Sequence, residues 1–497
     1  LHRRFSTLLM MAGLLFLSIY GFKYVDKIFF PEATRNQFMV DYWLPEGSRI
    51  QNVSEDLKKV EKYLMGLPEV TSVASCIGSG PPRFYLPYEP EVGNSSYGQL
   101  IVNVTHMKKI DKLLPGIERY LLENFPQAEP RVRKFPLGPA VNFKIEARFS
   151  GPEIQTLRCL SKEAREIMSN EAQCKNVRDD WRQLVKTWSP VFSQNRARRS
   201  LVTRMEMATA IQRLTDGIMV GTYREGDELL PILVRAPQEE RHDIENLELA
   251  PIWGYHATSF PLRQIISGRK IEWKDARVRR RDRSRTITVQ SDVKLGSSAN
   301  DVLAELRPKI KAMKLPPGYS LEWGGEFEKS YKSRSEVVAQ LPLALVLMAL
   351  VVVSLFRTFR ESLIIFLTLP LSIIGVTMGL LLTREPFGFM ALLGALSLLG
   401  MMIKNAVILL DQINLEIQEG KKPYDAVVES CVGRLRPVSM AALTTVLGML
   451  PLVWDTLFSS MAVTIIFGLS FATVLTLFVV PVLYVIGFNV QERLVGK

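Results

Sequence analysis

The chain has 497 residues, a formal net charge of +12 at pH 7 and 47% hydrophobic residues. A chain of this length usually forms several domains. Its four cysteines follow no Cys-x-x-Cys spacing and its four histidines are scattered, so neither a disulfide framework nor a zinc site is indicated. It contains no Gly-x-x-x-x-Gly-Lys-Ser/Thr loop, which argues against a pump driven by ATP.

Long apolar segments indicate a membrane protein. A helix that crosses a bilayer needs roughly 20 apolar residues, and six segments meet or approach this length: 5–24, 337–356, 362–382, 387–411, 438–454 and 461–488. The alternative is a buried helical core, but five almost uncharged runs joined by short charged or turn-forming segments favour membrane spans. The first segment resembles a signal peptide, yet no small-residue cleavage site follows it. Because the chain begins with Leu1 and not Met, we expect it to be a piece of a longer polypeptide.

The basic residues of the short connections indicate the orientation. Lys and Arg concentrate in cytoplasmic loops of membrane proteins. With the N-terminus in the cytoplasm, the short connections on the opposite side, 383–386 and 454–460, contain a single basic residue, Arg384. This orientation places residues of roughly 30–335 outside the cytoplasm, as one large insertion between the first and second spans.

Within the insertion, strand-like and helix-like periodicities alternate. The first part predicts strands near 38–44, 70–76, 100–104 and 130–135, with helices at 54–67 and 109–124. The second predicts strands at 141–149, 177–181, 285–293 and 320–323, with helices at 152–170 and 298–314. Both follow the order β-α-β-β-α-β, the split βαβ pattern, and the second is interrupted by a nested insert. The predicted fold class is therefore a membrane α-helical bundle of six spans plus an α+β extracytoplasmic domain of two ferredoxin-like split-βαβ modules.

Two stretches of the insertion have unusual composition. The basic run at 277–285 has no interleaved aromatic residues, so we expect a solvated or interface-pairing arm and no nucleic-acid binding. The loop 78–88 is rich in Gly and Pro and carries Phe84, Tyr85 and Tyr88. Exposed aromatic rings on a loop favour binding of apolar ligands, so these three residues are candidate substrate contacts. The alternative is that they anchor the loop to the core of its module.

The fourth span contains Lys404 next to Asn405. A charge at mid-membrane costs about 2.5–3.5 kcal/mol on insertion scales. About ten residues, or roughly 15 Å, separate Lys404 from Asn414, so its side chain cannot reach the water. We therefore expect Lys404 to lie inside the bundle and to face a carboxylate. No Asp or Glu lies at depth in the six segments, so that carboxylate must come from outside this sequence. Such a pair would act as a proton relay or as a static ion pair between two helices.

Several longer motifs resemble one known family. They are the segments 315–326 (LPPGYSLEWGGE), 400–411 (GMMIKNAVILLD), 434–437 (RLRP), 444–452 (TTVLGMLPL) and 480–484 (VPVLY). Together with the order of spans, they make the whole chain similar to the C-terminal half of a resistance-nodulation-division (RND) multidrug efflux permease of the acriflavin-resistance type.

The resemblance implies a domain plan. Residues 1–29 would form the first transmembrane helix and 331–490 the other five, followed by a cytoplasmic tail at 491–497. Residues 30–138 would form the first porter-type module, 139–181 and 284–330 the two parts of the second, and 182–283 a nested docking subdomain.

The resemblance also implies a function. A proton antiporter of the bacterial inner membrane would export amphiphilic drugs, with its large domain in the periplasm. It would act as a homotrimer with a periplasmic adaptor protein and an outer-membrane channel, and it would need no cofactor, no metal and no enzymatic activity. Heavy-metal efflux on the same fold is an alternative, disfavoured by the few histidines and by the lack of a Cys or Met cluster beyond Met205 and Met207. A half-permease with only a structural or assembly role is another.

Individual residues acquire roles from the same resemblance. Lys404 would pair with two aspartates on the absent N-terminal half, with Asn405 beside it, and Arg434 would lie by the proton path. Where many relatives have Thr, this chain has Ala441. Thr444, one turn along, is therefore a candidate to supply the missing hydroxyl.

Overall fold

The computed structural model describes residues 4–237, 244–254, 258–294 and 296–490. The expected cytoplasmic tail at 491–497 lies outside the described residues. The chain divides into two compact units, residues 1–181 with 278–497 and residues 182–277. Each unit is described by itself below.

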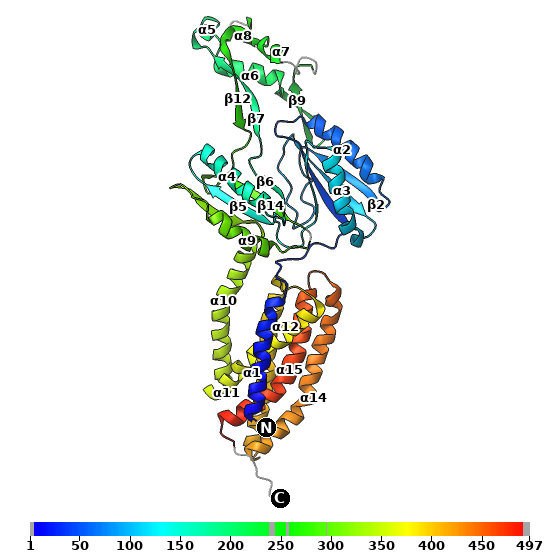
Figure 1. Ribbon diagram of the computed structural model, residues 1–497, viewed down its shortest axis with the longest axis vertical. Coiled ribbons are helices and arrows are strands. Elements are labelled where there is room, and N and C mark those ends of the chain that lie inside the picture. Colours follow the sequence, from blue (N-terminus) through cyan, green and yellow to red (C-terminus); the bar gives the residue numbers. More distant parts are fainter. Residues whose placement is uncertain (1–3, 238–243, 255–257, 295, 491–497) are drawn as a thin grey trace. The chain divides into compact units, whose positions relative to one another are not determined.

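The described chain has six helical segments that are long and apolar enough to cross a membrane (Figure 1). They are α1 (Arg4–Gly21) with a short 3-10 turn, α10 (Gly325–Phe356), α11 (Phe359–Thr368) continued by α12 (Ser372–Thr383), α13 (Phe389–Gln418), α14 (Pro423–Met449) and α15 (Ser459–Gly487). Six spans were expected, and six are found. However, α10 and α14 each begin at least twelve residues before the predicted apolar segment, because a helix can continue through charged residues beyond the apolar stretch that hydropathy detects.

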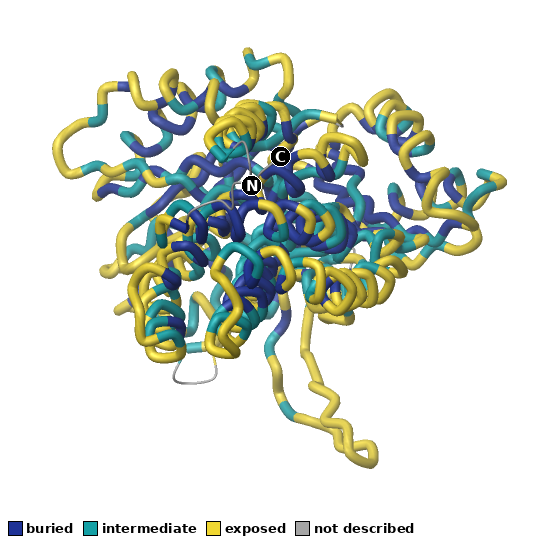
Figure 2. Tube along the Cα trace, turned by 90° about the horizontal axis from the view of Figure 1, so that it is seen from below, coloured by how far each residue is buried: buried dark blue, intermediate teal, exposed yellow. Residues whose placement is uncertain are grey.

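Helix α15 lies at the centre of the bundle, in contact with α11, α12, α13 and α14. Small residues allow the closest of these approaches, as expected for membrane helices. A Cβ atom added to Gly375 of α12 would lie 2.5 Å from the backbone oxygen of Phe467. Figure 2 shows how buried and exposed residues are distributed along the chain.

The first α+β module contains β1 (Gln37–Trp43), α2 (Ile50–Met65), β2 (Val70–Ile77), β3 (Tyr97–Val104), α3 (Ile110–Asn124) and β4 (Glu129–Lys134). Its antiparallel sheet has the order β2-β3-β1-β4. Apolar residues of α2 and α3, such as Leu57, Leu64 and Leu121, pack with Phe38 and Val102 of the sheet in one core. The expected chain order of strands and helices is therefore observed.

The second module contains β5 (Ile145–Ser150), α4 (Ile154–Ser169), β6 (Cys174–Asp179), β14 (Ser284–Val293), α9 (Ala299–Lys311) and β15 (Ser320–Gly324). Its sheet follows the order β13-β14-β5-β15, with β6 also paired to β14. Phe149, Leu157, Trp181 and Leu306 belong to its separate core.

The second compact unit comprises residues 182–277 and lies within the nested insert expected at 182–283. Beyond it, β13 (Arg280–Arg281) pairs with Arg285 and Ser284 of β14. The unit contains the pair β7 (Leu184–Phe192) and β12 (Ile266–Asp275), the hairpin β8 (Ile218–Glu225) and β9 (Glu228–Val234), the short strands β10 (Pro251–Trp253) and β11 (Ser259–Pro261), and helices α5 (Gln194–Arg199), α6 (Arg204–Leu214), α7 (Ile244–Glu248) and α8 (Leu262–Ile265).

Candidate functional site

Lys404 is exposed on α13, whereas its neighbour Asn405 is buried. The exposed positions of α13 lie on one side of the helix because their spacing follows the helical repeat: they include Ser397, Gly400, Lys404, Asp411 and Leu415. The opposite side is buried and mostly apolar. Within the part of the chain that the structure describes, Lys404 is therefore exposed and is not enclosed by these six helices. That it faces a carboxylate from outside this sequence stays a prediction.

Helix α14 has a face of small exposed residues that includes Thr444. They share one side by helical spacing and comprise Gly433, Pro437, Ala441, Thr444 and Gly448. A Cβ atom added to Gly400, Gly433 or Gly448 would meet no heavy atom of the described chain within 4 Å. The Thr444 hydroxyl donates to the carbonyl of Ala441 (3.0 Å), so the structure does not bring it to Lys404.

Arg434 of α14 is held against α13. Its Nη2 donates to Oε1 of Gln412 (2.5 Å), and Nε2 of Gln412 donates to Oε1 of Glu416 (3.1 Å). Lys421 then pairs with Glu416 and Glu429. In contrast, Lys404 has no hydrogen bond or ion pair within the part of the chain that the structure describes. A row of polar contacts thus leads from Arg434 towards the end of α13 and ends without reaching Lys404.

Glu361 is a buried polar residue of the bundle that the sequence analysis did not predict. It lies near the start of α11 and is buried, with its carboxylate accepting from Thr358 and from Nδ2 of Asn414 (3.0 Å). In the sequence it stands next to Arg360 of α11 and close to Arg357 of the short connection before that helix, a setting typical of a solvated connection. Neither Glu361 nor Gln412 carries a signal in the sequence that separates it from ordinary helix-end residues.

The loop 78–88 is attached to its module mainly through Tyr88. Tyr88 is buried and its hydroxyl donates to Oε1 of Gln99 (2.6 Å). Tyr85 and Phe84 pack against Phe135, but Phe84 remains 47% exposed. The geometry of Tyr88 fits the anchoring alternative, and among the three candidates Phe84 is the most exposed, although its ring also contacts Tyr88.

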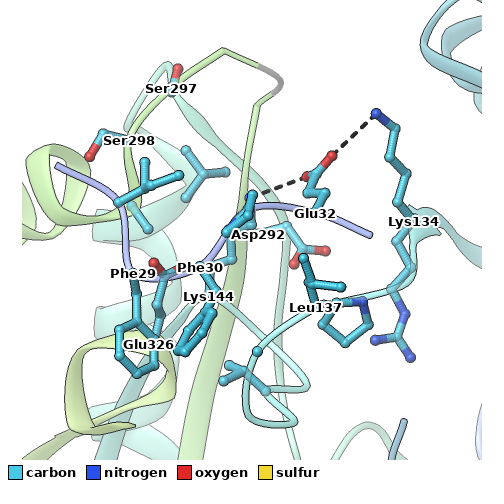
Figure 3. Close-up of a pocket in the computed structure, with 18 of the residues that line it drawn as sticks. Phe29, Phe30, Glu32, Lys134, Leu137, Lys144, Asp292, Ser297, Ser298 and Glu326 are labelled. Atoms are coloured by element: carbon cyan, nitrogen blue, oxygen red, sulfur yellow. Dashed lines mark ion pairs between the residues drawn. The ribbon is translucent and has the colours of Figure 1, made fainter. Parts of the chain in front are cut away.

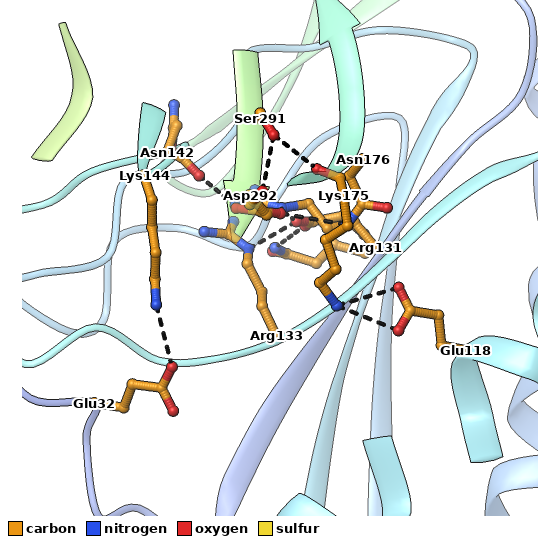
Figure 4. A network of polar contacts seen from close by, with 12 residues as sticks. Glu32, Glu118, Arg131, Arg133, Asn142, Lys144, Lys175, Asn176, Ser291 and Asp292 are labelled. Atoms are coloured by element: carbon orange, nitrogen blue, oxygen red, sulfur yellow. Dashed lines mark hydrogen bonds and ion pairs between the residues drawn. The ribbon is translucent and has the colours of Figure 1, made fainter. Parts of the chain in front are cut away.

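The two α+β modules meet through a buried charge network that no sequence pattern indicated (Figure 4). Nε of Arg131 on β4 donates to Oδ2 of Asp292 on β14 (2.5 Å), and its Nη2 donates to Oδ1 (2.7 Å). Asp41 on β1 accepts from Nε of Arg133 (2.8 Å). Asn176 on β6 also donates to Asp292. The partners lie up to 161 residues apart in sequence, so only the folded chain brings them together.

Both carboxylates of this network are ionised. Burial acts to raise the pKa of Asp41, but Arg133 and Arg131, together with hydrogen bonds donated by Tyr97 and Gln99, outweigh it and hold the pKa below its ordinary value. Burial likewise acts to raise the pKa of Asp292, but Arg131, with smaller contributions from Asn176 and Arg133, outweighs it and the pKa is lowered. The network is therefore a set of paired charges at neutral pH.

A cavity of about 340 Å³ lies next to the network, between the two modules and the irregular segment 28–32 (Figure 3). Arg131 and Asp292 form part of its wall. Its apolar lining includes Phe29, Phe30, Phe135 and Leu137, and its polar lining includes Glu32, Lys134, Lys144, Ser297, Ser298 and Glu326. Glu32 pairs with Lys134 (3.4 Å) and Lys144 (3.6 Å). Across the described ranges, no group of three or more His, Cys, Asp and Glu residues could hold a metal ion.

Comparisons with known proteins agree on one family. The family model described as "AcrB/AcrD/AcrF family" matches residues 1–487. The nickel and cobalt resistance protein CnrA of Cupriavidus metallidurans is 27% identical over 96% of this chain and 46% of its own length. The swarming motility protein SwrC of Bacillus subtilis is 23% identical over 98% of this chain and 46% of its own length. The crystal structure of a heavy metal efflux pump superposes with a TM-score of 0.77 at 18% identity, over 98% of this chain and 51% of that one. The chain therefore spans about half the length of these relatives.

Proposed function

The chain belongs to the AcrB/AcrD/AcrF family of RND permeases, and from this we propose that it is the C-terminal half of a proton-driven exporter of the bacterial inner membrane. The two α+β modules would be ferredoxin-like porter modules in the periplasm, and the unit 182–277 a docking subdomain. The exporter would act as a homotrimer with a periplasmic adaptor protein and an outer-membrane channel. The family membership and the six apolar helices support this proposal.

The polar outer face of α13 carries the proposal. A face that met only lipid would be apolar, because polar groups in hydrocarbon lose their hydrogen bonds to water. One exposed side of α13 differs from such a face, because it carries the polar residues Ser397, Lys404 and Asp411. The open space over Gly400 and Gly448 would let another helix approach closely. A helix from the remaining part of the transporter, with a carboxylate opposite Lys404, would satisfy both features.

Such a pair would couple protons to movement. With the carboxylate ionised, it attracts the Lys404 ammonium; once protonated, it releases the ammonium and the helices can shift. Arg434, held by Gln412, would carry positive charge at the cytoplasmic end of the same route, and Asn405 and Thr444 would flank it. A static ion pair between helices is the alternative role for Lys404.

For the substrate, we propose heavy-metal cations first. Three relatives are named for resistance to nickel, cobalt, cadmium or zinc. The order of the two substrate classes is therefore the reverse of the one that the resemblance to multidrug permeases implied. Amphiphilic compounds are the second candidate, supported by the exposed ring of Phe84 and by the mixed apolar and charged cavity between the modules. An assembly role without transport remains the third.

Growth assays separate these candidates. The complete transporter would be expressed in a strain that lacks its own exporters, with nickel, cobalt, cadmium and zinc salts in one panel and dyes and detergents in another. We expect resistance to metal salts that Lys404→Ala abolishes, while Lys422→Ala, an exposed loop lysine, retains it. Resistance to dyes alone would favour amphiphile export, and resistance to neither at normal expression would favour the assembly role.

A further inference from the structure

The basic run 277–285 contains a tight hairpin that the proposed function does not use. Its first strand, β13 (Arg280–Arg281), pairs with the start of β14. The two residues of the turn, Asp282 and Arg283, both have positive φ angles (48° and 67°), as the two-residue turn of a type I′ hairpin requires. Residues other than glycine rarely adopt this conformation. The short turn therefore fixes where the arginines on either side of it lie.

The arginines of the hairpin divide into two sets, because neighbouring residues of a strand point to opposite faces. Arg281 faces a carboxylate, since its Nη2 donates to Oε1 of Glu328 (2.9 Å). Asp282 also lies near Arg281, with 3.9 Å between its Oδ2 and Nε. In contrast, Arg280 and Arg283 are exposed and make no hydrogen bond or ion pair within the described part of the chain. Their two guanidinium groups are free to bind something else.

One hollow of about 460 Å³ is lined by three arginines, from β13, the turn and β14. They are Arg280, Arg283 and Arg285. Arg285 is held at the wall, where its Nη1 donates to the carbonyl of Pro152. Ser284 and Ser320 belong to the same lining, and among the described residues that form it none is acidic. The hollow therefore gathers positive charge without a carboxylate of this chain in its wall.

This arrangement suits an oxyanion. A guanidinium group presents its N–H donors as a planar fork that matches two oxygens of a carboxylate or phosphate. The free forks of Arg280 and Arg283 are supplemented by serine hydroxyl groups, which can donate to further oxygens. A bound anion would also offset the repulsion between the arginines. An apolar or cationic ligand would find no comparable interactions here.

The position of the hollow favours a free anion over a lipid headgroup. Ser320 begins β15, and β15 leads into α10 at Gly325. The first part of α10, residues 325–336, is rich in charged residues and precedes the expected apolar span. It comprises about twelve residues, or roughly 18 Å of helix, whereas the headgroup layer is only roughly 5–8 Å deep on each side of a bilayer. A phospholipid headgroup would therefore not extend as far as the hollow.

We propose that the hollow binds a small oxyanion of the phosphate or polycarboxylate class from the solution outside the cytoplasm. Arg280 and Arg283 would hold its oxygens in bidentate contacts, and Arg285 would add positive charge from the wall. Ser284 and Ser320 would donate further hydrogen bonds. The site includes none of the residues assigned to proton coupling or to substrate contact, so it can be tested without a transport assay.

Binding of inorganic phosphate and of citrate tests the site. The complete transporter would be placed in phosphatidylcholine nanodiscs, and isothermal titration calorimetry would measure each anion separately. We expect saturable binding of at least one of them to each chain. Arg280→Gln combined with Arg283→Gln should lower the affinity by about tenfold or more, because charge-assisted hydrogen bonds are lost. The matched control, Arg198→Gln combined with Arg199→Gln, removes two exposed arginines of α5 outside the hollow and should keep the native affinity.

Ser320→Ala separates a defined site from general attraction to positive charge, because it leaves the net charge unchanged. It should weaken binding by about threefold through the loss of one hydrogen bond, and an unchanged affinity would contradict a site in this hollow. The proposal would also be overturned if neither anion bound the native transporter saturably, or if the Arg280 and Arg283 double variant bound as tightly as the native protein.

A lipid headgroup as the source of the oxyanion is tested in a separate arm. Phosphatidylglycerol would be added to the nanodiscs at physiological ionic strength, where exposed charges are screened within about 8 Å. We expect the affinity for the free anion to stay the same. A lower affinity with phosphatidylglycerol than with an equal amount of added phosphatidylcholine would show that a headgroup occupies the hollow, and the assignment to a free anion would be wrong.

Discussion

Lys404 and Asn405 are neighbours in sequence but lie on different sides of α13, with Asn405 buried in the six-helix bundle and Lys404 on its outer face. The pair therefore marks where the bundle of this chain ends and where another helix is expected. An ammonium group left in hydrocarbon would cost several kcal/mol. The orientation of α13 makes this face, and not the interior of the bundle, the place where a partner carboxylate is needed.

Gln412 should affect transport through Arg434. Its Oε1 accepts from the guanidinium group (2.5 Å), so Gln412→Leu frees Arg434 while keeping a similar volume. We expect a lower maximal transport rate and a changed pH profile, measured with the complete transporter in proteoliposomes. Gln412→Glu, which can still accept, should restore most of the rate. If Gln412→Leu keeps the native pH profile, Gln412 does not position Arg434.

Gly375 should be indispensable for packing between α12 and α15. A Cβ atom there would lie 2.5 Å from the Phe467 oxygen and 2.8 Å from the Phe471 Cβ. Overpacking of this kind typically costs about 1–3 kcal/mol, so Gly375→Ala should lower the thermal unfolding midpoint. Gly116→Ala in α3, where a Cβ meets nothing within 4 Å, is the matched control and should not destabilise. Equal midpoints for both variants would contradict the close approach.

Asp180 should make the protein less stable at neutral pH than in mild acid. Burial is the largest cause that raises the pKa of Asp180, to about 6, although the backbone N–H of Thr288 and Arg279 act in the opposite direction. A carboxyl group with a raised folded-state pKa loses stabilisation as the pH rises from its ordinary pKa, near 4, through about 6.

Asp180→Asn removes the buried charge and can still accept the hydrogen bond from the Thr288 N–H. We expect it to stabilise the protein by about 1–3 kcal/mol at pH 7 and by much less at pH 4.5. Denaturation midpoints at the two pH values measure this difference. If Asp180→Asn stabilises the protein equally at pH 7 and pH 4.5, Asp180 is ionised at both pH values and its pKa is not raised.

Within the loop 78–88, we expect Tyr88 to anchor the loop and Phe84 to contact the substrate. Tyr88→Phe removes the hydroxyl that donates to Gln99 (2.6 Å) and should destabilise the module by about 0.5–1.5 kcal/mol. Phe84→Ala should leave stability nearly unchanged, because its ring is half-exposed, but should weaken transport of amphiphilic compounds. Unaltered transport of every substrate in Phe84→Ala would remove the loop from the substrate route.

The sequence predicted the features that depend on local periodicity. Hydropathy located all six spans, and alternation located the strands and helices of both modules to within a few residues. It could not locate the Arg131–Asp292 pair, because the residues lie 161 positions apart and each is an ordinary strand residue in its own segment. The sequence predicted that Lys404 needs a partner from outside this chain, but the apolar run of α13 could not show which side of the helix carries the charge; the structure places Lys404 on an exposed side.

Proton-driven substrate flux of a Lys404 variant tests the central claim most directly. Complete transporters with Lys404 or with Lys404→Met would be reconstituted at equal amounts in proteoliposomes, and flux driven by an imposed pH gradient would be measured. The account predicts that the variant loses flux by more than about tenfold, which corresponds to at least 1.4 kcal/mol of lost coupling, while it still folds and binds substrate. Native flux in Lys404→Met would contradict a coupling role for the ammonium group on the outer face of α13.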